Sequence, residues 1–150
     1  MSLIAINRIS AIKNQLRSMS TSVNKIVHTA SAPAAIGPYS QAIVANGFVF
    51  CSGSLPVNPT NNQVVPGGVK EQAEQVLTNM GEVLKAANSS FDRIVKSTVF
   101  VKDMNDFAAV NEIYGKRFGE NFPARSCVEV ARLPKDVLVE IECIATVSAQ

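Results

Sequence analysis

The longest regular pattern of apolar positions lies in residues 69–88. Apolar residues recur there every three or four positions, which is the spacing of one face of an α-helix. They are Val69, Ala73, Val76, Leu77, Met80, Val83, Leu84 and Ala87. A second helix is predicted from Asp103, a side chain suited to capping a helix N-terminus, to about Glu120. Its apolar stripe consists of Phe107, Val110, Tyr114 and Phe118.

Other segments have the short apolar runs, or the alternation of apolar and polar residues, that are typical of β-strands. They are residues 25–28, 41–46, 48–52, 94–101, 124–133 and 138–147. Asn46-Gly47, between the second and third of them, is a favoured hairpin turn. The order of elements predicts an α+β fold, a two-layer sandwich in which both helices cover one face of a mixed sheet. Several strands are apolar on both sides, so we expect another chain to cover the second face.

Residues 1–22 differ in composition from the rest of the chain. They contain no Asp or Glu, and their basic residues are Arg8, Lys13 and Arg17. A basic, serine-rich, amphipathic segment without acids is typical of a mitochondrial transit peptide, and Arg8 and Lys13 interrupt the apolar stretch that a secretory signal needs. We therefore predict a transit peptide over residues 1–22, a domain over residues 23–150 and a location in the mitochondrial matrix. An N-terminal tail of a cytosolic protein is the alternative, and Met19 could start a cytosolic form.

The composition limits the classes of function. The 150 residues are 47% apolar and 17% charged, which suits one globular domain. The net charge is +2, but outside residues 1–22 the basic residues number 14 − 3 = 11 against 12 acidic ones. Lys and Arg do not cluster there, so no nucleic-acid patch is predicted. One histidine, His28, and three cysteines without CxxC spacing exclude a histidine-rich metal centre, a pair of catalytic imidazoles and a thiolate zinc site.

One arginine near a predicted loop could bind an anion. Arg125 begins the strand predicted at 124–133, directly after Phe122-Pro123. The guanidinium fork matches the two oxygens of a carboxylate, so a small acid is a plausible ligand. The alternative is a surface ion pair, for instance with Glu129.

Acidic residues and cysteines on the predicted strands are the other candidates for chemistry. Glu140 and Glu142 share one side of the last strand, and we expect Glu142 to lie nearer the core, where burial would raise its pKa and allow proton exchange near neutrality. A solvated pair of carboxylates is the alternative. Cys51, Cys127 and Cys143 are expected to be small core residues.

Several motifs resemble the reactive intermediate deaminase A (RidA, or YjgF) family. In chain order they are AAIGPYSQA at 34–42, SG at 52–53, VFVKD at 99–103, PARSCVEV at 123–130, LP at 133–134 and EIE at 140–142. The resemblance covers residues 24–147, and its most specific part is PARSCVEVARLPKD. The chain departs from the family pattern at Ser54, where many members have Gln.

The resemblance implies a chorismate-mutase-like fold and a homotrimer with sites in the clefts between subunits. It implies hydrolysis of enamine and imine acids, such as 2-aminoacrylate, 2-iminopropanoate and 2-iminobutanoate, to 2-keto acids and ammonia without a cofactor or metal. It also implies a functional link to pyridoxal-phosphate-dependent threonine or serine dehydratases, which release such imines, and to isoleucine synthesis.

The resemblance also assigns roles to individual residues. Arg125 would hold the substrate carboxylate, and Glu142 would orient the attacking water. The further substrate contacts would be Tyr39, Ser52, Gly53, Asn111 and the backbone amide of Cys127. Two alternatives remain open: a single-stranded RNA endoribonuclease or translation inhibitor, and a non-catalytic module that binds small carboxylates.

Overall fold

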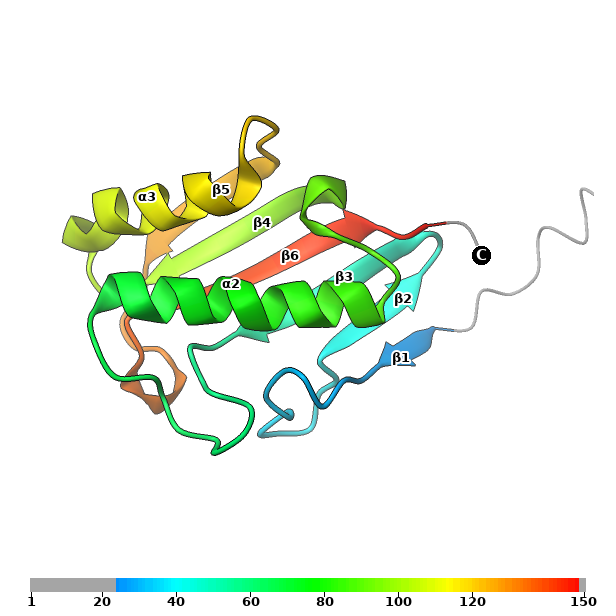
Figure 1. Ribbon diagram of the computed structural model, residues 1–150, viewed down its shortest axis with the longest axis horizontal. Coiled ribbons are helices and arrows are strands. Elements are labelled where there is room, and N and C mark those ends of the chain that lie inside the picture. The colour runs from blue at the N-terminus through cyan, green and yellow to red at the C-terminus, as the bar shows by residue number, and fades with distance from the viewer. Residues whose placement is uncertain (1–23, 149–150) are drawn as a thin grey trace, which may run out of the picture.

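The computed structural model describes residues 24–148, which form a six-stranded sheet with two α-helices on the same face (Figure 1). The predicted transit peptide lies outside the described residues. The strands are β1 (Lys25–Val27), β2 (Ala42–Ala45), β3 (Phe48–Ser54), β4 (Ile94–Val101), β5 (Ala124–Glu129) and β6 (Val139–Thr146). The helices are α2 (Val69–Ala86) and α3 (Phe107–Phe118), and short 3-10 turns span Phe91–Arg93, Met104–Asp106 and Pro134–Asp136.

The sheet is mixed, as predicted. Its strand order is β1-β2-β3-β6-β4-β5, and all neighbours are antiparallel except β4 and β5. Helix α3 connects these two parallel strands, and α2 connects β3 to β4 across β6. The α+β two-layer fold predicted from the order of elements is confirmed.

Helix α2 begins at Val69, as predicted, whereas α3 begins at Phe107, four residues after the predicted start at Asp103. Polar side chains bind backbone N–H groups before both helices. The Asp103 side chain accepts a hydrogen bond of 2.8 Å from the Asn105 amide and opens the 3-10 turn that leads into α3. Before α2, the Glu71 carboxylate accepts a bond of 2.8 Å from the Gly68 amide. Against the sheet, Leu77 and Met80 of α2 are fully buried.

The fifth strand ends earlier than predicted. The prediction ran through residue 133, but β5 stops at Glu129. Its partner β4 ends at Val101, and the Val130 amide makes a final bond of 3.0 Å to the Val101 carbonyl. Beyond that point β4 offers no further backbone hydrogen bonds. Residues 131–133 therefore cannot extend the strand, although their sequence alternates between apolar and polar residues.

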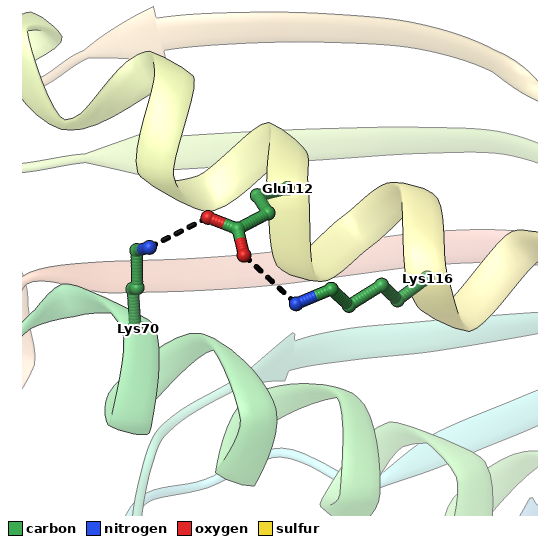
Figure 2. Close-up of polar contacts among 3 residues, drawn as sticks. All are labelled: Lys70, Glu112 and Lys116. Carbon is green, nitrogen blue, oxygen red and sulfur yellow. Dashed lines mark hydrogen bonds and ion pairs between the residues drawn. The ribbon is translucent and has the colours of Figure 1, made fainter.

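A surface cluster of charges links the two helices (Figure 2). Glu112 of α3 accepts a hydrogen bond of 2.6 Å from Lys70 of α2 and one of 2.8 Å from Lys116 of its own helix. These bonds, first that from Lys116, lower the pKa of Glu112 to about 2. Because all three side chains are exposed, the cluster orients α3 on α2 and contributes little to stability.

The sheet face opposite the helices, here called the open face, is mainly apolar on β1 to β3 and carries Lys96, Thr98, Glu140 and Glu142 on β4 and β6. One row of paired residues crosses the sheet from β1 to β5: Ile26, Ile43, Phe50, Ile144, Lys96 and Ala124. Phe50 remains 46% exposed and Ile26 67%. The sequence predicted several strands that are apolar on both sides, and residues 24–148 leave this face uncovered. None of the helices in this part of the chain has the length and apolar composition needed to cross a membrane.

Candidate active site in two halves

The first half of the candidate site surrounds Arg125, the second residue of β5. Arg125 pairs with Ser97 of β4, and Ser97 is buried under α3, so Arg125 lies on the helix-covered face. Its guanidinium carbon is 4.7 Å from the ring centroid of Tyr114 and 5.8 Å from that of Phe107. Such cation–π contacts hold the guanidinium plane without neutralising its charge.

The position of the Tyr114 ring is itself fixed by its buried surroundings. Its hydroxyl shares a hydrogen bond of 2.7 Å with the Ser97 hydroxyl, and its ring stacks on Phe118 at a centroid distance of 4.1 Å. Burial raises the pKa of Tyr114, so the phenol is protonated at neutral pH. The ring therefore provides a rigid, uncharged surface for Arg125.

Arg125 has no ion pair among residues 24–148. Glu129, the partner considered from the sequence, instead accepts a bond of 2.7 Å from the Met104 amide. The alternative of an Arg125–Glu129 surface ion pair is therefore wrong. Arg125 borders a hollow of about 300 Å³, which is also lined by Asn111, Tyr114, Gly115, Phe122 and Pro123.

The structure thus brings together Asn111 and Arg125, two of the predicted substrate-binding residues. Cys127 follows Arg125 on the same side of β5 and is partly buried. Burial raises the pKa of the Cys127 thiol, and the Arg125 charge offsets part of this effect. A protonated thiol suits the predicted role, in which the backbone amide of Cys127, rather than its sulfur, contacts the ligand.

The second half of the candidate site lies on β3 and the loop before β2. Tyr39, Ser52 and Gly53 line a small cavity of about 50 Å³ there. The Ser52 hydroxyl donates a bond of 2.7 Å to the Ser40 carbonyl, and the Ser52 amide donates one of 3.0 Å to the Gln41 carbonyl. These bonds fix the Tyr39 loop against the end of β3. Tyr39, Ser52 and Gly53, all predicted to contact the substrate, therefore line the same side of the cavity.

The same loop is clamped by the buried side chain of Gln41. Its amide nitrogen donates to the carbonyl oxygens of Thr29, Ala32 and Pro33 at 2.8–3.3 Å, and its oxygen accepts a bond of 2.7 Å from the Thr29 amide. A buried carboxamide with this many partners makes the loop rigid.

Gly53 lies directly against the Glu140 carboxylate of β6. A β-bulge between Cys51 and Ser54 turns the backbone here, and a Cβ atom at residue 53 would collide with the carboxylate. Glycine therefore allows the carboxylate to lie here, and a larger residue would displace it. Glu140 is half-buried, and this burial, with the nearby Glu142 charge as a second cause, raises the pKa of Glu140.

Glu142, the carboxylate predicted to orient the water, lies elsewhere on β6. Its side chain borders a separate hollow of about 190 Å³ on the open face, together with Phe50, Lys96 and Thr98. Of the two carboxylates, Glu140 is the one that lies against Gly53, and burial raises its pKa; the water-orienting role of Glu142 stays a prediction. Strand alternation places both carboxylates on one side, and only the bulge determines which of them reaches the Ser52-Gly53 backbone.

The two charged side chains, Arg125 and Glu140, lie on opposite faces of the sheet. Arg125 faces the helices, whereas Glu140 pairs with Phe100 of β4 and faces the open side. Strand β4 separates β5 from β6. A molecule of a few carbon atoms cannot touch Arg125 and Glu140 of the same chain at once. Within the described residues, no group of three or more His, Cys, Asp or Glu side chains is arranged to hold a metal ion.

Comparison with known proteins agrees with the motifs. The family model described as Endoribonuclease L-PSP matches residues 29–147. A RutC family protein of Synechocystis sp. is 60% identical over 123 residues, which are 81% of this chain and 95% of that protein. A protein of Bos taurus named 2-iminobutanoate/2-iminopropanoate deaminase is 54% identical over 127 residues, which are 85% of this chain and 93% of that protein.

Solved structures have the same fold. The crystal structure of E. coli TdcF with bound serine superposes with a TM-score of 0.79 and 48% identity, and the match covers 83% of this chain and 99% of that one. Together with the matched motifs and the fold, these similarities identify the family. The chain belongs to the Endoribonuclease L-PSP family, which includes the RidA and RutC proteins that its motifs resemble.

Proposed function

We propose that this chain is a hydrolytic deaminase that converts short-lived imine and enamine acids, such as 2-iminopropanoate and 2-iminobutanoate, to 2-keto acids and ammonia. The observation that carries the proposal is the surroundings of the Arg125 side chain. Aromatic rings hold its guanidinium beside a hollow of about 300 Å³, and no acidic partner occupies it within residues 24–148. Relatives with about half of their residues in common are named for this activity.

The chemistry requires few groups. The carbon of an imine is already electrophilic, so the reaction needs an oriented substrate and a directed water molecule. Arg125 would bind the substrate carboxylate through two parallel hydrogen bonds. Water adds to the C=N carbon, the nitrogen gains protons, and the C–N bond breaks to release ammonia and leave the keto group.

Glu140 is the carboxylate that we assign to the proton transfers. A base that takes a proton from water and returns it to the leaving nitrogen works best when its pKa lies nearer the working pH. Burial raises the pKa of Glu140 in this direction, and its carboxylate lies against Gly53, a predicted substrate contact. Tyr39 and Ser52, which line the same cavity as Gly53, would contact the substrate on this side of the site.

The proposed site is completed by a second copy of the chain. Arg125 and Glu140 lie on opposite faces of one sheet, so a shared substrate needs Arg125 from one copy and Glu140 from another. A homotrimer would supply three such sites and would also bury the apolar row on the open face. Phe50, at the centre of that row, is 46% exposed in the single chain.

RNA cleavage is the second candidate, because the matching family model is described as an endoribonuclease. The charge distribution gives it little support, since the basic residues do not cluster in the sequence after residue 22. The single histidine, His28, follows β1, at the opposite edge of the sheet from Arg125 on β5.

A mitochondrial matrix location next to a pyridoxal-phosphate-dependent threonine or serine dehydratase would place the deaminase where such imines are released. The support is the composition of residues 1–22, basic and free of acids. Fusion of these residues to a fluorescent protein tests the location, and diffuse cytosolic fluorescence would contradict it.

The direct test couples purified threonine dehydratase to this protein and follows the appearance of 2-oxobutanoate. We expect the protein to accelerate the imine step. Arg125→Ala should reduce this acceleration about a thousandfold, because two charge-assisted hydrogen bonds are lost. The matched control is Arg132→Ala, which removes an exposed arginine paired with Asp136. Equal rates for the parent and Arg125→Ala would refute the proposed function, and cleavage of single-stranded RNA by both would favour the second candidate.

A further inference from the structure

Two polar side chains lie on the buried face of α2. Gln72 is 7% exposed and Asn79 is 2% exposed, whereas the other buried positions of this helix are apolar. A buried carboxamide lowers stability unless its polar atoms form hydrogen bonds, so each of the two requires an explanation. Asn79 follows Gln72 by seven residues. Seven residues are close to two helical turns, so the two side chains lie on the same side of α2, about 10 Å apart.

Asn79 holds the chain that follows the β-bulge of β3. Its amide nitrogen donates hydrogen bonds of 2.9 Å and 2.8 Å to the carbonyl oxygens of Leu55 and Val57. Its side-chain oxygen accepts a bond of 2.8 Å from Gln75 of the same helix, so the carboxamide cannot turn without losing partners. Leu55 follows Gly53 by two residues. Asn79 therefore ties the chain directly after Gly53 to α2.

Gln72 holds the start of β6 in a similar way. Its side-chain oxygen accepts a hydrogen bond of 2.8 Å from the Leu138 amide. The Leu138 carbonyl accepts a bond of 3.0 Å from the Lys102 amide, so both backbone groups of this residue have partners. Glu140 follows Leu138 by two residues and lies on β6. Gln72 therefore ties the chain directly before Glu140 to α2.

The two tied segments carry the two partners of one contact in the candidate site. Gly53 of β3 lies against the Glu140 carboxylate of β6, in the space that a Cβ atom at residue 53 would occupy. Helix α2 packs on both strands (Figure 1). A slip of one residue in either strand would turn its side chains to the other face of the sheet and break this contact. Because both segments are bound to the same helix, their relative position is fixed.

We propose that Gln72 and Asn79 are a pair of positioning residues that together keep Gly53 and the Glu140 carboxylate in contact. They act through the backbone of β3 and β6 and not on the substrate. The release of either segment opens the contact, so the release of the second adds little. This inference rests on the proposed deaminase function and on the assignment of Glu140 to the proton transfers.

The test combines Gln72→Met and Asn79→Leu, which keep the approximate size of each side chain and remove its hydrogen bonds. Steady-state rates on 2-iminobutanoate give kcat and KM. Each variant should lose about tenfold in kcat, because small displacements of a catalytic group are costly. The double variant should also lose about tenfold in kcat, whereas the reductions in melting temperature should add, since the two side chains are about 10 Å apart. KM should change less than about threefold, because Arg125 on β5 still binds the carboxylate.

The matched control is Leu84→Ala, which removes a fully buried side chain of α2 that has no polar contact with β3 or β6. It should lower the melting temperature and leave kcat unchanged. A second comparison introduces Asn79→Leu into Glu140→Gln, in which no carboxylate remains to be positioned, so the further loss in kcat should be less than about threefold. If Asn79→Leu does not fold, Asn79→Ser, which keeps one hydrogen-bond donor, replaces it in both comparisons.

Four results would overturn the positioning role and leave the proposed function intact. They are an unchanged kcat in the single variants, a loss of about a hundredfold in the double variant, an undiminished loss in the Glu140→Gln background, and a loss in Leu84→Ala equal to that in Asn79→Leu. A parent protein that does not hydrolyse 2-iminobutanoate would overturn the proposed function and this inference with it.

Discussion

The two halves of the candidate site are built in different ways. Arg125 lies on a regular strand, and side chains of a regular helix hold it by stacking. Glu140 lies where the sheet is irregular, at a β-bulge and against a glycine. Aromatic rings thus orient the Arg125 guanidinium and leave its hydrogen-bond donors available. The Glu140 carboxylate is instead positioned next to the closely approaching backbone of Gly53.

The separation of the two charges has a chemical consequence. If Arg125 and Glu140 were neighbours in one chain, they would form an ion pair that occupies the guanidinium and lowers the pKa of the carboxyl group. Their placement on opposite faces avoids both effects: Arg125 keeps its charge available, and the pKa of Glu140 stays raised. Assembly from two copies would bring them to the same substrate with the small acid between them.

A substitution that prevents copies of the chain from associating should have the largest effect on deaminase activity. Phe50→Glu places a charge in the middle of the apolar row on the open face, where its burial against another chain would be strongly unfavourable. We expect a folded monomer without detectable deaminase activity, measured by light scattering after size exclusion and by the coupled assay. Thr60→Glu, which adds the same charge on an exposed loop, is the control and should remain assembled and active. A parent protein that is active as a monomer would contradict the prediction that two copies are needed to form the site.

Glu140→Gln and Glu142→Gln form a matched pair that distinguishes the two carboxylates. The loss of a general acid–base group at residue 140 should reduce kcat about a hundredfold, whereas the change at residue 142 should cost less than about threefold. A Glu whose pKa is raised on folding makes the folded state less stable as pH rises above its ordinary value of 4.5, so Glu140→Gln should melt at or above the parent temperature at pH 7. The reverse ranking of activities would support the role predicted for Glu142.

Arg125→Lys tests whether the shape of the cation matters as well as its charge. Lysine keeps the positive charge but offers neither the planar fork nor the stacking surface for Tyr114. We expect a loss of about thirtyfold in kcat/KM, mainly through a higher KM, from steady-state rates on 2-iminobutanoate. An activity equal to that of the parent would show that the aromatic cradle has no part in binding.

The sequence was sufficient for most of the fold and for one half of the site. Apolar periodicity located both helices and the strands. Asp103 acts as a cap, because such bonds involve neighbouring residues, but it caps the 3-10 turn before α3 rather than α3 itself. The end of β5 was missed because it depends on where β4 stops. Which of Glu140 and Glu142 lies against Gly53 could not be predicted for a similar reason, since a bulge between distant strands cannot be read from alternation.

The aromatic support of Arg125 was also missed, although a signal was present. Phe107 and Tyr114 were assigned to the apolar stripe of the second helix, and that stripe is the surface that packs on the sheet near β5. Parallel connection of β4 to β5 through this helix would have placed Arg125 beside it. Predicting the contact between Arg125 and the rings of α3 therefore requires the order and direction of the strands. The pattern of either segment alone is not enough.

The smallest effect is expected far from both halves, at the exposed cluster that links α2 and α3. Glu112→Gln removes the negative charge and with it both ion pairs to lysine, and it should lower the melting temperature only slightly at pH 7. Because the pKa of Glu112 is lowered to about 2, its contribution is present above pH 4.5 and is lost as pH falls toward 2. The difference from the parent should shrink in that range and in 1 M salt, and deaminase activity should not change. A loss of activity would mean that the position of α3 affects the Arg125 half.

The central claim is that Arg125 of one copy and Glu140 of another act on the same substrate. Arg125→Ala and Glu140→Gln chains, each nearly inactive alone, can be unfolded together and refolded in equal amounts. In a randomly mixed cyclic assembly about a quarter of the sites then contain both intact residues, so we predict recovery of about a quarter of the parent activity in the coupled assay. A mixture no more active than the two variants refolded separately would contradict the account.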